Sequence, residues 1–279
     1  VNSAGTISVD TANLLAATTT GVVTASIATT EAVSELNTLT GTNGAYTIVV
    51  AAGDATTTTA AQLNTLNGKT TVAVDLTNVT ALAGSSLSDL ETFASAVNAN
   101  EFSNDSGLTT IAVTDTTIDA TTLASTIDSY DAIGGTTDMT LASGATINVD
   151  AGEITEMLTD ESAGRLTIVD QVITVNSAAT ISVDTANLLE ATTTGVVTAS
   201  ITTTETVSKL NTLTGTNGAY TIVVATGDAT STTAADLNTL NGKTTVAVDL
   251  TNVTALAGSS LSDLGTLASA IGANEFSND

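Results

Sequence analysis

The chain repeats itself at a fixed distance of 174 residues. Residues 1–105 align with residues 175–279 without an insertion, and the two copies differ at 12 of these 105 positions. The differences include Ala16 against Glu190, Glu35 against Lys209 and Phe93 against Leu267, and we expect most of them to be mild. The 279 residues therefore form one complete long repeat (1–174) and a partial second copy (175–279) that continues directly from the first.

A shorter and looser repeat recurs inside the long one. A β-rich segment is followed by a polar stretch rich in Asp and Thr, and then by a short helix-like segment; the clearest example runs from residues 46–50 to residues 60–68. Seven apolar anchors of the helix-like segments, on average 29 residues apart, mark the spacing: Leu14, Leu36, Leu63, Leu87, Leu123, Ile154 and Leu188. One long repeat thus holds about six short repeats.

One short repeat buries too little apolar surface to fold alone, because helices of fewer than about 12 residues are marginal in water. Stacking removes this difficulty, since each strand pairs in parallel with its neighbours and each helix covers the back of the sheet. We therefore predict an α/β fold, a solenoid of stacked strand–short-helix repeats with a parallel sheet. The alternative is an all-β parallel β-helix, in which the helix-like segments are further strands.

Local signals mark the ends of the predicted helices. Two segments have capping-box spacing: Thr59-x-x-Gln62 and Asp150-x-x-Glu153. Two aspartates stand where an N-cap is expected: Asp10 and Asp184. Three glycines follow helical stretches, where a left-handed residue would end the helix: Gly68, Gly134 and Gly164.

The composition removes whole classes of chemistry. The chain has no His, Cys, Pro or Trp, so it lacks an imidazole base, a thiol nucleophile and the ordinary ligands of zinc, haem and iron–sulfur clusters. With 4 Lys+Arg against 29 Asp+Glu, its net charge of −25 repels nucleic-acid phosphates and anionic lipids, and we expect no nucleic-acid partner. The longest apolar runs, such as residues 48–52, are far shorter than the about 20 residues that span a bilayer, so we expect no membrane insertion.

Carboxylates are the abundant ionisable groups, and two pairs were weighed as a glycoside-hydrolase site: Asp128 with Asp131, and Glu153 with Glu156. We interpret both pairs as part of a solvated helix face or a helix start, and the absence of an aromatic platform for a sugar further disfavours a hydrolase. The four basic residues are Lys69, Arg165, Lys209 and Lys243, and a Ser–Lys nucleophile pair is an alternative for the lysines. They lack the context of such a pair. We therefore assign no catalytic, cofactor-binding or metal-ligating residue and predict that the chain is not an enzyme.

Acidic secreted repeats often bind calcium, but the EF-hand spacing and the Gly-rich nonapeptide of calcium-binding repeats are both absent. We therefore predict that no cofactor is required, with a structural calcium ion as the alternative. The two segments that could bind it are Asn104-Asp105-Ser106-Gly107 and Gly134-Gly135-Thr136-Thr137-Asp138. Thr makes up about a fifth of the chain, but it falls in runs such as residues 18–20 and 56–59 rather than on the strict grid of an ice-binding face.

Strings such as residues 6–15 (TISVDTANLL) and 146–151 (TINVDA) resemble the tandem repeats of giant type I-secreted adhesin-like and cell-surface proteins of bacteria, including those of cyanobacteria. The resemblance covers the whole chain. It implies an extracellular or cell-surface location and a structural or adhesive role, and it carries over no functional residue. The calcium nonapeptide usual in that family is missing here.

These observations predict a structural repeat segment of an extracellular filament, surface layer or adhesin stalk. The expected partners are further copies of the same repeat in the parent chain, with a homo-oligomer or filament as a further option. The alternative function is a binding module for glycan, mineral or ice on the solenoid face. Because the chain starts at Val1 without Met and stops inside the second copy, we expect it to be a segment of a longer protein.

Overall fold

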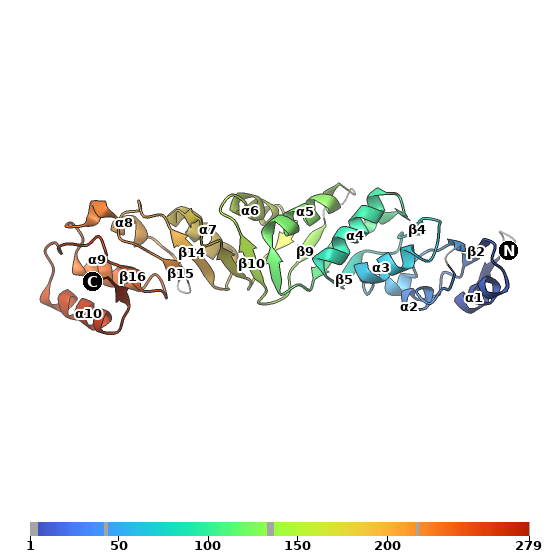
Figure 1. Ribbon diagram of the computed structural model, residues 1–279, viewed down its shortest axis with the longest axis horizontal. Helices are drawn as coiled ribbons and strands as arrows, with labels where there is room; N and C mark the ends of the chain where they lie inside the picture. Colours follow the sequence, from blue (N-terminus) through green and yellow to red (C-terminus); the bar gives the residue numbers. More distant parts are fainter. Residues whose placement is uncertain (1–4, 42–43, 133–136, 216–217, 279) are drawn as a thin grey trace. The chain divides into compact units, whose positions relative to one another are not determined.

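The computed structural model describes residues 5–41, 44–132, 137–215 and 218–278. Over these residues the chain is a mixed α/β protein in which the strands of each sheet pair in parallel and every sheet is open (Figure 1). The predicted α/β class is therefore confirmed. The all-β alternative is wrong, because the described residues include ten α-helices.

None of these helices exceeds 12 residues. Their bounds are α1 (Val9–Thr18), α2 (Val33–Leu36), α3 (Ala60–Asn67), α4 (Leu87–Asn98), α5 (Ala120–Asp131), α6 (Ile154–Ser162), α7 (Val183–Thr192), α8 (Val207–Leu210), α9 (Ala234–Asn241) and α10 (Leu261–Gly272). Three 3-10 turns accompany them: η1 (Ala52–Asp54), η2 (Asp105–Gly107) and η3 (Thr226–Asp228).

The chain forms two compact units. Compact unit 1 comprises Val1–Asp115, Thr122–Ala142 and Asp160–Thr167, and compact unit 2 comprises Thr116–Thr121, Ser143–Thr159 and Ile168–Asp279. The boundary of the long repeat, between residues 174 and 175, is a feature of the sequence, and the two units divide the chain elsewhere.

Compact unit 1 holds three sheets. The first has the order β1 (Thr6–Ile7), β2 (Val23–Ile27) and β3 (Gly44–Thr47). The second pairs β4 (Val74–Asp75) with β6 (Phe102–Ser103). The third has the order β11 (Leu166–Thr167), β9 (Asp138–Thr140), β7 (Thr110–Val113) and β5 (Ala81–Ser85). In compact unit 2 one sheet has the order β13 (Thr180–Ile181), β14 (Val197–Ile201), β12 (Val172–Val175), β10 (Thr146–Val149) and β8 (Thr117–Asp119), and β15 (Ala219–Thr221) also pairs with β14. A second sheet pairs β16 (Val248–Asp249) with β17 (Phe276–Ser277).

Paired strands are separated by about the length of one short repeat. The smallest separation is 20 residues, as between Thr6 and Ser26, and the largest is 29, as between Thr117 and Thr146. The second copy reproduces the first at a distance of 174 residues, because Thr180 lies opposite Ser200 as Thr6 lies opposite Ser26. The near-identical sequences therefore adopt the same strand register.

The short repeat contains more strand than its sequence pattern predicts. Between α4 and α5 the chain forms both β7 and β8, and between α5 and α6 it forms both β9 and β10. The prediction of one strand for each helix is wrong here. Strands such as β8 and β9 have only three residues, too few for an alternating pattern to be visible, and they form because a neighbouring strand supplies the hydrogen bonds.

The core is aliphatic, as a composition with 2% aromatic residues requires. Five of the seven predicted anchors are buried: Leu36, Leu63, Leu87, Leu123 and Ile154. The other two are wrong, because Leu14 is 67% exposed and Leu188 is 57% exposed. In α1 the buried residues are Val9 and Ala12, and Leu14 lies about 200° around the helix from Ala12.

The N-terminal caps agree in part with the sequence. Thr59 and Gln62 form the predicted capping box of α3. The N-cap of α1 is Ser8, whose side chain accepts from the N–H of Thr11, so the assignment of Asp10 is wrong. Ser182 caps α7 in the same way, which also corrects Asp184. In each helix the aspartate lies in the first turn, where it still favours the positive end of the helix dipole.

The predicted ends agree in part as well. Gly164 has the predicted left-handed conformation, with φ +71°. Gly68 ends α3 with φ −67°, which any residue adopts, so the prediction of a left-handed residue is wrong there. Gly134 lies outside the described residues. Glu153 accepts from the N–H of Asp150 over 3.1 Å, but α6 begins one residue after this glutamate, so the pair orders the approach to the helix rather than its N-cap.

Candidate functional site

Several carboxylates are already used to hold neighbouring short repeats together. The first N–H of α2, at Val33, donates to Oδ2 of Asp54 over 2.8 Å, and the first N–H of α4, at Leu87, donates to Oδ2 of Asp115 over 2.8 Å. The second copy repeats the first of these contacts at the equivalent residues. A carboxylate at a helix N-terminus is stabilised by the helix dipole and by the free N–H groups. These aspartates therefore have a structural role.

A ladder of asparagine side chains forms a second kind of link. Each Nδ2 donates to the backbone carbonyl 25 residues further along, over 2.9–3.2 Å: Asn13, Asn37 and Asn64 in the first copy, and Asn187, Asn211 and Asn238 in the second. The distance of 25 residues carries each bond from one short repeat to the next. In the described part of the chain, Oδ1 of Asn37 and of Asn64 is buried without a partner, so these two side chains take part in the ladder through Nδ2 alone.

The pair Asp128 and Asp131 contributes to an ion-pair cluster. Arg165 pairs with Asp131 and with Asp160, which is 3% exposed. The hydrogen bond that Arg165 donates to Asp131 raises the pKa of Arg165, and the nearby charge of Asp128 acts in the same direction. Asp131 and Asp160 both accept from the guanidinium of Arg165. This arrangement stabilises the fold rather than providing the acid of a hydrolase.

The pair Glu153 and Glu156 is not brought to a common partner by the contacts of the described residues. Glu153 accepts hydrogen bonds from the Oγ1 of Thr121 and from the N–H of Asp150. Glu156 lies exposed in the first turn of α6. Its place agrees with the interpretation as a solvated helix face.

The lysines also take surface or structural positions. Nζ of Lys209 lies 2.5 Å from Oδ1 of Asp184, and both side chains are exposed. Nζ of Lys243 donates to the carbonyl of Leu213 over 2.8 Å, and Lys69 is half-buried. A nucleophilic lysine needs a hydroxyl or carbonyl substrate within reach, and these contacts supply only an ion pair and a backbone bond.

The loop considered for calcium is tied to a neighbouring strand by its own side chain. Nδ2 of Asn104 donates to Oδ1 of Asp75 over 3.0 Å, and residues 105–107 form the 3-10 turn η2. The described residues contain no group of three or more Asp or Glu that could hold a metal ion. Residues 134–136 of the other candidate loop lie outside the described part.

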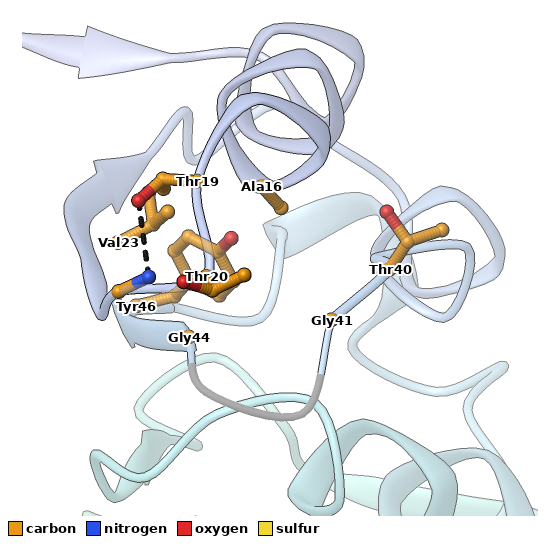
Figure 2. Close-up of a pocket in the computed structure, with 9 residues that line it drawn as sticks. Ala16, Thr19, Thr20, Val23, Thr40, Gly41, Gly44 and Tyr46 are labelled. Atoms are coloured by element: carbon orange, nitrogen blue, oxygen red, sulfur yellow. Dashed lines mark hydrogen bonds between the residues drawn. The ribbon is translucent and has the colours of Figure 1, made fainter.

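A pocket of about 230 Å³ lies near the start of the first copy (Figure 2). It is lined by the end of α1, the segment that follows α1, the segment between α2 and β3, and parts of β2 and β3: Ala16, Thr19, Thr20, Gly21, Val23, Thr40, Gly41, Gly44 and Tyr46. None of these residues carries a charge. Gly44 is required for the shape, because a Cβ there would lie 2.1 Å from Cε2 of Tyr46.

The buried hydroxyl of Tyr46 distinguishes this pocket. The side chain is 1% exposed, and among the described residues its Oη has no hydrogen-bond partner. Burial raises the pKa of Tyr46, so the group keeps its proton and acts as a donor. A buried donor without an acceptor costs about 1–3 kcal/mol relative to a paired one. An acceptor at this hydroxyl would therefore stabilise the folded chain.

The second copy shows the same tyrosine with a partner. Oη of Tyr220 donates to Oε1 of Glu190 over 2.6 Å. Burial first, and then the hydrogen bond and charge of Glu190, raise the pKa of Tyr220. The carboxyl group packs directly on Gly215, where a Cβ would lie 2.1 Å from Cδ of Glu190. In the first copy Ala16 replaces Glu190.

Sequence reasoning missed this pocket, although it identified the difference between Ala16 and Glu190. The only signal was that single substitution, and its meaning depends on a tyrosine 30 residues away. Comparison with protein-family models, with curated proteins and with solved structures finds no match to this chain. Every helix in the described residues is too short or too polar to cross a membrane.

Proposed function

We propose that the chain is a structural repeat segment of an extracellular filament, surface layer or adhesin stalk, built as an α/β solenoid in which each short repeat stacks on the next. The observation that carries this proposal is the parallel pairing of strands at separations of 20–29 residues. A stack of similar coils has this pairing pattern, because each strand lies beside the corresponding strand of the next coil.

Side-chain contacts between neighbouring short repeats support the same proposal. Asp54 caps the helix of the preceding short repeat at Val33, and Asn64 donates to the carbonyl of Asp89 in the following one. Such contacts recur along the chain, whereas an enzyme concentrates its specialised groups in one site. Uniform links suit a protein whose function is length and mechanical continuity.

A difference in burial between equivalent leucines of the two copies gives further support. Leu90 in α4 is fully buried, and Oη of Tyr130, from the following short repeat, donates to its carbonyl over 3.2 Å. In the second copy the described residues reach Asn278, the counterpart of Asn104. There Leu264, the counterpart of Leu90, is 36% exposed. A short repeat is thus covered by the one that comes after it.

Lengthening the chain tests the stacking. A copy of residues 106–174 placed after Asp279 would complete the second long repeat and cover Leu261, which is now 89% exposed. Burying one Leu contributes about 2 kcal/mol, so the amides of α10 are expected to exchange with solvent more than tenfold more slowly. The control is a Gly/Ser extension of equal length, which should leave exchange unchanged. Equal exchange rates in both extended proteins would contradict the proposal.

The proposed location rests on the resemblance to secreted surface proteins. An antibody against this chain is expected to label intact cells of its source, and labelling only after permeabilisation would contradict an extracellular place. The alternative function, a binding module for glycan, mineral or ice, predicts specific binding by this segment in a glycan array, a mineral-adsorption assay or an ice-recrystallisation assay.

The proposal requires no cofactor. Addition of calcium or of a chelator is therefore expected to leave the unfolding temperature unchanged, since bound calcium would stabilise the folded state by mass action. An increase with calcium that saturates would instead establish a structural calcium ion.

A further inference from the structure

The two copies of the long repeat contain the same pocket in a filled and an open form. The nine residues that line it in the first copy have identical counterparts in the second, except for Ala16, whose counterpart is Glu190. These two residues occupy equivalent positions in α1 and α7. The difference between the two forms therefore reduces to one side chain.

The filled form shows which chemical group satisfies the site. The Glu190 carboxylate accepts the hydrogen bond of Tyr220 Oη over 2.6 Å and packs against the bare backbone of Gly215. A carboxylate matches this donor well, because hydrogen bonds to an ionised acceptor are stronger than those between neutral groups. The methylene groups of Glu190 connect that carboxylate to the helix.

The open form retains every part of the site except the carboxylate. Tyr46 is among the residues that line a cavity of about 230 Å³ (Figure 2), and its Oη is buried without a partner among the described residues. Figure 2 shows Ala16 and Thr40 around the same space, and Thr19, whose Oγ1 accepts from the N–H of Gly21 over 3.0 Å. A water takes about 30 Å³ of the liquid, so the space admits a molecule of several non-hydrogen atoms.

We infer that the pocket of the first copy binds a short aliphatic carboxylate of two to four carbons, with its alkyl group beside Ala16 and its carboxylate on Oη of Tyr46. The ligand takes the place that the side chain of Glu190 fills in the second copy. No lining residue carries a negative charge. The repulsion by the net charge of −25 is screened over about 8 Å at 0.15 M salt.

The test uses propionate, whose carboxylate and adjacent methylene group match the part of the glutamate side chain that Ala16 lacks, with one further methyl group. The chain contains only three tyrosines, Tyr46, Tyr130 and Tyr220, so labelled tyrosine rings give three resolvable sets of NMR signals. Propionate is expected to shift the Tyr46 ring signals saturably and to leave the other two in place. The dissociation constant should be on the order of 1–10 mM, as for a ligand of about five atoms with one strong hydrogen bond.

Four controls separate this site from unspecific binding. Ala16→Glu fills the pocket from within, so Tyr46 signals should move toward those of Tyr220 and propionate should no longer shift them. Tyr46→Phe is followed by the signals of the flanking backbone amides, and binding should weaken about tenfold. Glu190→Ala opens the second pocket, so Tyr220 should also respond. Propionamide, which lacks the charge, should bind more weakly than propionate.

Two results would overturn the inference. One is the absence of any saturable shift of Tyr46 up to about 100 mM propionate, roughly ten times the largest expected constant. The other is a shift of equal size in the Ala16→Glu protein. If Glu190→Ala disturbs the fold of compact unit 2, the two variants in compact unit 1 still decide the question, because Ala16 and Tyr46 both lie there.

Discussion

Replacing Leu87 by Ala is expected to destabilise its surroundings much more than the same change at Leu261, its counterpart in the second copy. Both leucines occupy the first position of a helix in the same local sequence, SSLSDL, and each helix has a serine N-cap whose side chain accepts a backbone hydrogen bond. Leu87 is 6% exposed, whereas Leu261 is 89% exposed. Helix propensity and capping are therefore common to both sites, and burial is the difference.

The expected magnitudes follow from that burial. The change removes about three carbon groups, each contributing about 0.8 kcal/mol when buried. Scaled by burial, the transfer free energy lost is about 2.3 kcal/mol at Leu87 and about 0.3 kcal/mol at Leu261. The cavity that remains in a packed site raises the cost at Leu87 to about 3 kcal/mol.

Hydrogen exchange read by mass spectrometry on peptides of α4 and α10 is the suitable assay, because a repeat chain need not unfold in one step. In Leu87→Ala the amides of α4 are expected to exchange about 100-fold faster, and in Leu261→Ala those of α10 less than twofold faster. Equal acceleration in the two variants, or less than about tenfold at α4, would refute the reasoning that the following short repeat stabilises the preceding one.

Three further predictions concern polar groups. Asn64→Asp sets a carboxylate against a backbone carbonyl, so the pKa of the new carboxyl group rises in the folded chain. The variant should lose about 2 kcal/mol of unfolding free energy at pH 7. This loss should shrink below the unfolded pKa of Asp, and urea titrations at the two pH values measure it. Arg165→Met removes the cation beside the nearly buried Asp160 and should cost about 3 kcal/mol at pH 7 by the same assay. The hydrogen bond from Ser143 lowers the pKa of Asp170 in the folded chain. The stabilisation that Asp170 contributes is therefore present above its unfolded pKa and is lost as the pH falls through its folded pKa. Ser143→Ala should raise the folded pKa of Asp170, which an NMR titration measures.

Each of these has a clear contrary outcome. A loss for Asn64→Asp that does not change with pH would mean that the new carboxyl group escapes to solvent. A cost below about 0.5 kcal/mol for Arg165→Met would place its ion pairs among the weak surface pairs, of which Lys209 with Asp184 is the example in this chain. An unchanged titration of Asp170 in Ser143→Ala would assign its shift to the N–H of Gly144, its second donor.

Local patterns predicted a large part of the fold. The predicted helix-like segment at residues 60–68 contains α3, and the capping box of Thr59 and Gln62 is formed, because both depend on residues close together in the chain. The burial of Leu14 and the conformation of Gly68 were wrong for the opposite reason. Which side of a short helix is covered, and how its last turn ends, depend on the packing of the neighbouring short repeat.

The candidate site could not be predicted from the sequence alone. The sequence showed that Ala16 replaces a glutamate, but a single substitution in a helix does not indicate which distant group it faces. The tertiary structure gave it one by bringing Tyr46 from β3 beside the end of α1. Likewise, the sequence contained four basic residues, and only the folded chain shows that Arg165 is the one that joins Asp131 to Asp160.

The sequence by itself determined the repeat, the α/β class, the absence of imidazole and thiol chemistry, and most of the helices, because periodicity, composition and capping act over a few residues. Only the tertiary structure decided the second set of strands, the exposure of Leu14 and the open pocket at Tyr46. These features arise between segments 20–30 residues apart, where a hydrogen bond or a covered side chain depends on which groups the neighbouring short repeat presents.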